Sequence, residues 1–266
     1  MLLTQNRELK QDGVWNFTLP AWVIELPDGS HFNVCPNAGA CAKFCYARNG
    51  TYLFPKVRGK HLRNLEVAQS PEFYHAMHDE LSRKRMRPSG EHRTIPGLPD
   101  TSHLTDWVNG WIANGGQAVR IHDSGDFFSE IYYLDWIDLA WEFQDILFYA
   151  YTKEVALTEK LKTEVDWPDN LLTIYSMGGG QDHLVDKDTM RHADVFPDLE
   201  SIEAAGYMSQ HQSDLLCVLL PTTRVGIPQN NIPHFKKQLN GRTFSQAQQD
   251  RRQKTAIKSD NKKGSA

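Results

Sequence analysis

Apolar residues recur at helical spacing in the first half of the chain. This periodicity predicts helices over residues 56–68, 71–85 and 101–114. Two shorter segments before them, 19–26 and 31–34, alternate between apolar and polar positions and predict strands. We therefore expect a helix-rich N-terminal half that carries little of the main sheet.

The second half of the chain alternates strands with helices. Short apolar runs predict strands over 118–122, 146–151, 171–176, 193–196 and 215–220, with helices over 129–143 and 154–163. Strands that recur roughly every 20–30 residues with helices between them are typical of a parallel sheet. The pattern predicts an α/β fold, either a TIM-barrel-like fold that is partial or irregular, or an open doubly wound sheet. In both forms, ligands bind beyond the C-terminal ends of the strands.

The chain shows no internal repeat and no linker, so we expect one domain over residues 1–240. The remaining segment, 241–266, consists mostly of Gln, Lys, Arg, Ser and Asp after Phe244. Such a composition offers little to bury and predicts a basic, disordered C-terminal tail.

Composition and charge exclude two classes of protein. Of the 266 residues, 40% are hydrophobic, which is enough apolar mass for a core and excludes wholesale disorder. The 29 Lys and Arg against 33 Asp and Glu give a net charge of −4, which excludes a uniformly basic nucleic-acid binder. Residues 236–266 carry +7 of this charge, so residues 1–235 carry −11.

The N-terminal segment is polar and shows no signal-peptide pattern, and no apolar run reaches the length of a membrane helix. We therefore expect a cytoplasmic protein that does not bind membranes. In that compartment thiols stay reduced, so clustered cysteines indicate a metal site rather than disulfides.

Three of the four cysteines lie within eleven residues, at Cys35, Cys41 and Cys45. Small residues separate them, and three thiolates on one short loop can supply three corners of a [4Fe–4S] cluster. Phe44 stands where it could cover one face of that cluster. Zinc is the alternative metal, with His31 or Cys217 as fourth ligand, and three unliganded buried cysteines are a further alternative.

The segments CPNAGACAKFCYA, RIHDSGDFFS at 120–129 and FYAYTK at 148–153, in this order, resemble the phage "gene product 88" family. That family in turn is distantly similar to radical S-adenosylmethionine (SAM) enzymes. The resemblance implies an iron–sulfur barrel, SAM as a further cofactor, and the host cell cytoplasm as the location of a phage-encoded member. The spacing C-x5-C-x3-C differs from the C-x3-C-x2-C that is typical of radical SAM enzymes.

Cys217 decides whether such a cluster has an open iron. As a fourth ligand it would close the cluster, which would then be structural, electron-transferring or sensing. As an ordinary buried cysteine it would leave one iron open for a substrate or SAM. The sequence leaves both readings open.

Several other residues follow the predicted strands and are candidates for cofactor or substrate binding: Ser124, Asp126, Lys153, Ser176, Gly178 and Gly179. Each has a plain structural alternative. Asp126 could cap the next helix, Lys153 could pair with Asp126, and the glycines could form a turn. His122 is expected to be a core histidine.

Lys and Arg residues are dense over 56–63 and 83–87. A solvated helix face is the default explanation, and a phosphate-backbone contact, together with the basic tail, is the alternative.

The leading hypothesis is a [4Fe–4S] protein with radical or redox chemistry at the cluster and an unknown small molecule or electron donor as partner. The alternatives are a fully Cys-ligated cluster in a non-enzymatic protein, and a zinc-stabilised protein that binds nucleic acid. The sequence does not decide whether the protein is an enzyme.

Overall fold

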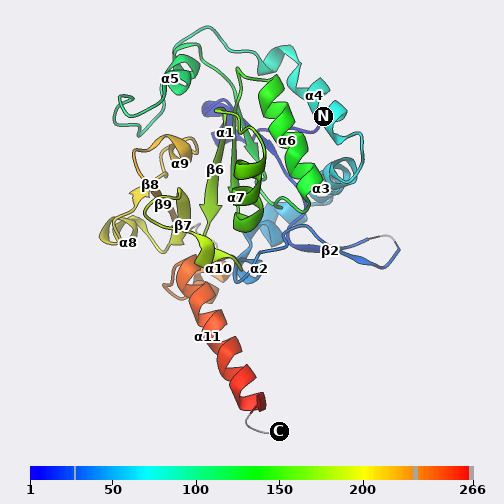
Figure 1. Ribbon diagram of the computed structural model, residues 1–266, viewed down its shortest axis with the longest axis vertical. Coiled ribbons are helices and arrows are strands. Elements are labelled where there is room, and N and C mark those ends of the chain that lie inside the picture. The colour runs from blue at the N-terminus through cyan, green and yellow to red at the C-terminus, as the bar shows by residue number, and fades with distance from the viewer. Residues whose placement is uncertain (27, 230–232, 264–266) are drawn as a thin grey trace.

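A seven-stranded sheet, parallel throughout, forms the centre of the protein (Figure 1). The computed structural model describes residues 1–26, 28–229 and 233–263. In spatial order the strands are β1 (Val14–Phe17), β4 (Ala118–Ile121), β5 (Leu147–Thr152), β6 (Leu171–Ser176), β7 (His192–Phe196), β9 (Arg224–Pro228) and β8 (Met208–Ser209). A separate antiparallel hairpin, β2 (Val23–Glu25) and β3 (His31–Asn33), projects from the body.

Helices connect the strands and cover both faces of the sheet. The α-helices are α1 (Arg7–Gln11), α2 (Cys41–Phe44), α3 (Pro55–Ala68), α4 (Phe73–Leu81), α5 (Asp106–Ala113), α6 (Glu130–Glu142), α7 (Val155–Glu164), α8 (Leu199–Ala204), α9 (Leu216–Leu219), α10 (Pro233–Leu239) and α11 (Phe244–Lys263). Short 3-10 helices span Tyr46–Arg48, Gly50–Leu53, Lys84–Met86 and Asp182–Leu184.

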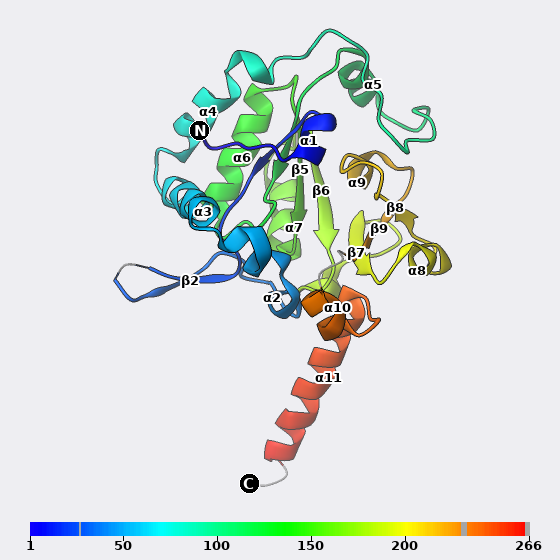
Figure 2. The same cartoon turned by 180° about the vertical axis from the view of Figure 1, so that it is seen from behind.

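Two apolar cores lie on opposite faces of the sheet, because side chains alternate along each strand. On one face, Val119 and Phe148 pack with residues of α3, α4, α6 and α7. On the other, Ala118 and Tyr149 pack with residues of α1, α5 and α9. Figure 2 shows this second face, with α1 in front of the sheet and α6 and α7 behind it.

The predicted α/β organisation with parallel strands is confirmed. Consecutive strands from β4 to β7 are neighbours in the sheet, as the strand–helix repeats indicate. The sheet is not closed: β1 and β8 are its two edges. The predicted extra helices before β4 are also present, as α3, α4 and α5.

The predicted strand at 215–220 is wrong. Leu216–Leu219 form the short helix α9, and every residue from Leu215 to Leu220 is at most 5% exposed. An apolar run of this length fits a buried helix as well as a buried strand. The strand beside β7 is instead β9, whose Gly226 and Pro228 weaken its strand pattern.

The predicted disorder from 241 onward is also wrong for the described part of the tail. Phe244–Lys263 form α11, which extends away from the body (Figures 1 and 2). Its first turns are anchored, because Phe244, Ala247 and Gln248 are buried. The Gln, Ala, Lys and Arg residues that follow are favourable helix formers. Residues 264–266 lie outside the described part of the chain.

No helix among the described residues is long and apolar enough to cross a membrane.

Candidate functional site

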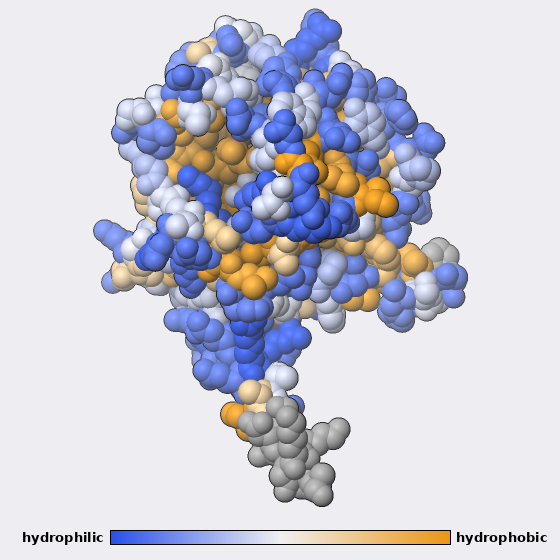
Figure 3. All heavy atoms as spheres, viewed as in Figure 1, coloured by the Kyte–Doolittle hydropathy of each residue, from blue (hydrophilic) through white to orange (hydrophobic). Residues whose placement is uncertain are grey.

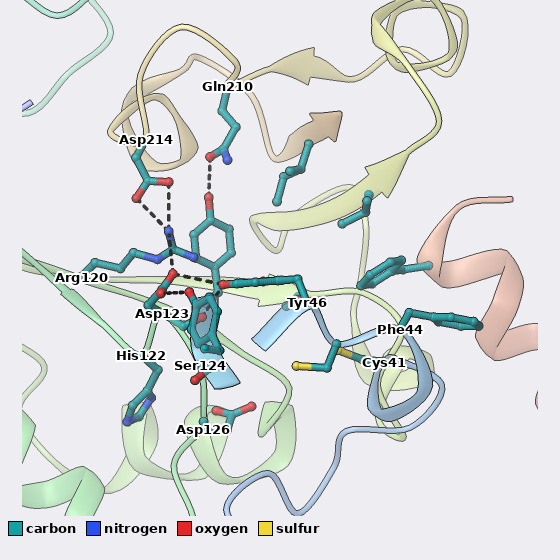
Figure 4. A pocket seen from close by; sticks show the side chains of 18 of the residues that line it. Cys41, Phe44, Tyr46, Arg120, His122, Asp123, Ser124, Asp126, Gln210 and Asp214 are labelled. Carbon is teal, nitrogen blue, oxygen red and sulfur yellow. Dashed lines mark hydrogen bonds and ion pairs between the residues drawn. The ribbon is translucent and has the colours of Figure 1, made fainter. Parts of the chain in front are cut away.

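A cavity of about 780 Å³ lies at the C-terminal ends of the strands. Its wall includes residues at or just beyond the ends of β4, β5, β6, β7 and β9, together with the cysteine loop (residues 35–45). The candidate residues that the structure brings to this cavity are Cys35, Cys41, Cys45, Ser124, Asp126, Lys153 and Ser176. Figure 4 shows Cys41 on one side of the cavity, with Arg120 and Asp123 on another.

Backbone hydrogen bonds hold the cysteine loop against the loop that follows β6. The amide of Cys41 donates to the carbonyl of Gly178 at 3.1 Å, and the amide of Gly180 donates to the carbonyl of Asn37 at 2.8 Å. The carboxylate of Glu154 accepts from the backbone amide and the side-chain amide of Asn37, at 3.0 and 2.6 Å. The loop is therefore fixed to the strand ends at several points.

The three cysteines of the loop form one electrostatically coupled group. Burial raises the pKa of Cys35 well above its usual value, and the charges of Asp126, Cys45 and Cys41 raise it further. Burial, followed by the charge of Cys41, raises the pKa of Cys45 to about 12. Cys35 and Cys45 are therefore protonated at neutral pH, and they would lose their protons on binding a metal.

Lys153 places a cation in this group. Burial lowers the pKa of its ammonium, but the charges of Cys41, Asp126, Asp182 and Cys35 together raise it above its ordinary value. Its Nζ donates to Oγ of Ser176 at 2.6 Å. The ion pair with Asp126 that the sequence left open is not found among the described residues: the backbone amide of Lys153, not its ammonium, donates to Asp126, at 2.9 Å.

Asp126 joins the ends of β4 and β5. Its carboxylate accepts from the amide of Phe127 at 2.9 Å and from Oγ1 of Thr152 at 2.6 Å, besides the amide of Lys153. It does not cap α6, because Ser129 does so through its bond with the Tyr132 amide. Burial raises the pKa of Asp126, against the effect of these hydrogen bonds.

Gly125, just before Asp126, has a backbone conformation that only glycine adopts easily, with φ of +90°. A Cβ there would lie 2.5 Å from Cβ of Leu19. Ser124 is fixed to the same residue, since its hydroxyl donates to the Leu19 carbonyl. The SGD sequence is thus explained by packing as well as by its position at the cavity.

Gly178 and Gly179 do not line the cavity. Their amides donate to the carboxylate of Asp182, at 2.9 and 2.7 Å. Together with Gly180 they form the turn against which the cysteine loop packs. The geometry of Gly178 and Gly179 therefore favours the turn, which was the structural alternative, over contact with a cofactor in the cavity.

Cys217 lies apart from the other cysteines. It is a fully buried residue of α9, in the core that this helix forms with the sheet, and it is not among the residues that line the cavity. The charges that act on it come from Asp214, Arg120 and Arg191. The structure thus brings three cysteines together at the cavity and leaves the fourth in the core.

A charged network that the sequence analysis did not single out forms the opposite wall of the cavity (Figure 4). Arg120 lies between two carboxylates, with Nη1 3.3 Å from Oδ1 of Asp214 and 3.6 Å from Oδ1 of Asp123. Tyr46 and Tyr52 donate to Asp123, and Tyr149 donates to Asp214. The signal in the sequence was Arg120 itself, a charged residue within an otherwise apolar strand.

His122 is buried, as expected of a core histidine, but it also lines the cavity, and its Nδ1 has no hydrogen-bond partner among the described residues. It is 2% exposed, its Nε2 lies 2.8 Å from the hydroxyl of Tyr132, and burial lowers its pKa to about 3. Since this value lies below the ordinary value of 6.5, the unfolded chain binds a proton between the two values and the folded chain does not. Folding stability is therefore lost as the pH falls below about 6.5.

We expect His122→Asn to remove this pH dependence. Asparagine tolerates the positive φ of 67° at this position and does not titrate. At neutral pH the variant should be less stable than the natural protein, and the difference should shrink by roughly 2 kcal/mol between about pH 7 and about pH 5. Chemical denaturation at the two pH values measures this, and a difference that stays constant would contradict it.

The two basic segments differ in their surroundings. In 56–63, Lys56, Arg58 and Arg63 are exposed. In 83–87, Arg83 and Arg85 pair with the carboxylate of Glu80, which is buried. Part of the second basic segment is thus neutralised within the protein.

A single metal ion would require three ligand side chains that converge on one point. Among the described residues, no group of three or more His, Cys, Asp or Glu side chains is arranged in this way.

The chain matches a family of known proteins. The family model described as "Gene product 88" matches residues 1–258. The Gene 88 protein of Mycobacterium phage D29 is 30% identical over 132 residues, which cover 49% of this chain and 46% of that protein. The chain therefore matches about half the length of this relative. No solved structure matches the chain.

Proposed function

This chain belongs to the gene product 88 family, and from that premise we propose that it binds a [4Fe–4S] cluster through Cys35, Cys41 and Cys45. The cavity beside these cysteines would hold the molecule on which the cluster acts. The observation that carries the proposal is the position of three cysteine thiols on the wall of a cavity of about 780 Å³, beyond the C-terminal ends of the strands.

The donor set fits this group. In a [4Fe–4S] cluster each thiolate ligates its own iron, so the sulfurs need not converge on one point as they do around a single ion. Ala38 and Ala42, which also line the cavity, keep the loop free of bulky side chains. Phe44 lies at the wall and packs on Phe244, with ring centroids 6.0 Å apart.

The chain's own residues prepare the site for an anionic group. Lys153 places its ammonium beside the thiols and offsets the negative charge that their deprotonation creates. Phe44 and Phe244 cover the loop on the side of α10 and α11 and reduce contact with water. When bound, such a cluster supplies single electrons, to a redox partner or to SAM held at the iron that no cysteine of the loop ligates.

Radical SAM-type chemistry is the finer form of the proposal. It is supported by parallel strands that follow one another in the sheet almost in chain order, as in part of a barrel. It is also supported by the distance of Cys217 from the loop in the fold, because a cluster with three cysteines keeps one open iron. The partners would be an electron donor and a small molecule that fits the cavity.

Purification without oxygen, followed by incubation with SAM and a strong reductant, tests this finer form. We expect formation of 5′-deoxyadenosine that depends on Cys41. A protein that holds iron and sulfide but gives no 5′-deoxyadenosine would reject the SAM branch and leave electron transfer. A colourless protein with zinc and no sulfide would reject the cluster itself, and with it both SAM chemistry and electron transfer.

Replacing Lys153 tests the electrostatic part of the proposal. We expect Lys153→Gln to lower the reduction potential of the cluster by on the order of tens of millivolts, because a nearby cation stabilises the reduced, more negative state. Spectroelectrochemical titration measures the potential. Lys160→Gln is the control, because Lys160 lies on the surface and pairs with Glu130 at 2.7 Å. Equal potentials in the natural protein and Lys153→Gln would contradict the prediction.

A further inference from the structure

A second cavity, of about 430 Å³, lies on the side of the cysteine loop that faces α11. It is bordered by one stretch of the loop, by the glycine turn after β6 and by one face of α11. Its lining residues are Pro36, Asn37, Gly39, Gly180, Gln248, Arg251, Arg252, Thr255 and Ala256. None of these residues lines the larger cavity.

The charge of this lining is entirely positive. Arg251 and Arg252 are its two ionised side chains, and it contains no Asp or Glu. Two carboxylates that contact residues of the loop and the glycine turn are already engaged: Glu154 accepts from Asn37, and Asp182 accepts from the amides of Gly178 and Gly179. The larger cavity is different, because its wall carries five carboxylates against two cations.

Contacts with the loop hold both arginines in place. Gln248, which is 5% exposed, accepts from the amide of Ala40 at 2.8 Å and fixes α11 against the loop. Arg251 donates through Nη1 to the carbonyl of Gly39. Arg252 donates through Nη2 to the carbonyl of Gly180 at 2.7 Å and lies 2.6 Å from Nδ1 of His183. The two guanidinium groups are therefore ordered by hydrogen bonds before any ligand arrives.

These hydrogen bonds do not use all the N–H donors of the two arginines. A guanidinium carries five N–H groups, and each arginine uses one terminal nitrogen in the contacts above. Within the described residues, Nε and the other terminal nitrogen of each arginine make no further hydrogen bond, and neither does Nε2 of Gln248. Donors that are held in place and carry positive charge match an oxyanion, since arginine recognises phosphate through paired N–H groups.

We propose that this second cavity is a phosphate-binding site, formed by Arg251, Arg252 and Gln248. Its ligand is a phosphate group, either free or part of a nucleic-acid backbone. The next basic residues of α11, Lys254 and Lys258, are exposed like the two arginines but do not line the cavity. Figure 3 shows a hydrophilic surface on the part of α11 nearest the body, on the face in view. Since the arginines hold Gly39 and Gly180, a bound phosphate would also act on the cysteine loop.

Two variants of the protein test the site. Binding of inorganic phosphate is measured by calorimetry, and binding of a fluorescent single-stranded oligonucleotide by anisotropy. We expect the double substitution Arg251→Gln and Arg252→Gln to weaken binding at least about tenfold, because charged hydrogen bonds are lost. Thr255→Glu keeps both arginines and places a negative charge at the cavity wall, and it should weaken binding to a similar extent.

Matched controls separate the cavity from the general charge of α11. Lys254→Gln with Lys258→Gln removes the same charge outside the cavity, and Ile257→Glu adds the same charge outside it. Both should change affinity less than about twofold at physiological salt, because these residues do not line the cavity and charges at a distance from a ligand are screened. Circular dichroism checks that each variant is folded. If Arg251→Gln with Arg252→Gln is unfolded, the comparison of Thr255→Glu with Ile257→Glu decides.

The outcomes are distinct. Phosphate binding that depends on the arginines supports a site for free phosphate groups. Oligonucleotide binding with the same dependence, and no binding of phosphate alone, supports a nucleic-acid backbone as the source. No binding of either probe, or equal losses in the cavity variants and their controls, would overturn the proposal. Metal content does not enter this test, so its failure would leave the proposed cluster untouched.

Discussion

Replacing Cys35, Cys41 or Cys45 singly by serine will remove most of the iron and sulfide from protein purified without oxygen. Each thiolate of the loop is proposed to ligate one iron, and serine is a much harder ligand that iron–sulfur clusters rarely use. The visible absorption of the cluster should fall in parallel. Iron, sulfide and protein are measured on the same sample, so that loss of cluster is distinguished from loss of protein.

Cys217→Ser is the matched control for these variants. Cys217 is a fully buried residue of α9 and does not line the cavity. We expect this variant to be less stable, because a hydroxyl replaces a buried thiol, and yet to keep the iron and sulfide content of the natural protein. Loss of the cluster from Cys217→Ser to the same degree as from Cys41→Ser would mean four cysteine ligands, and would reject an open iron.

Gly39→Ala is expected to displace the cysteine loop and destabilise the protein by about 2–5 kcal/mol. Gly39 has φ of +57°, where alanine is strained, and a Cβ there would lie 2.6–2.7 Å from backbone atoms of Gly178, Gly179 and Gly180. A backbone cannot rotate away as a side chain does, so the loop must move. We therefore expect loss of cluster as well as loss of stability, measured by chemical denaturation and by iron content.

Gly50→Ala controls for the backbone strain alone. Gly50 has φ of +59°, nearly the value at Gly39, and a Cβ there would meet nothing within 4 Å. We expect it to cost about 1–2 kcal/mol and to leave the iron content unchanged. Equal effects of the two substitutions would show that the contact between the loop and the glycine turn does not hold the site together.

The sequence predicted those elements in which local signals and burial agree. The strand at 171–176 is found with the same bounds, and Ser129 caps α6 as its position before the apolar run indicates. Even there, burial was harder to predict than the helix itself. Ile131 lies on the predicted apolar stripe but is 75% exposed, because the aromatic residues Tyr132 and Trp136 take the buried face.

Elements that depend on tertiary contacts were not predictable in this way. The short strand β1 lies beside β4, more than a hundred residues away in the chain, and its four residues carry little signal of their own. α11 is polar along most of its length, and its attachment comes from the buried Phe244 and Gln248 at its start.

The candidate site likewise contains residues that the sequence could group and residues that only the fold brings together. Proximity in sequence was enough to group Cys35, Cys41 and Cys45. The rule for parallel sheets placed Asp126, Lys153 and Ser176 at the same edge of the sheet, and the structure brings all of these to one cavity. Asp123 and Asp214 surround Arg120 from segments far apart in the chain, and no local pattern announces such a cluster.

The most direct test of the central claim is the composition of the natural protein purified without oxygen. We predict ~4 iron atoms and ~4 acid-labile sulfides per chain, with the visible spectrum of an iron–sulfur protein. A colourless protein with one zinc per chain and no sulfide would contradict it.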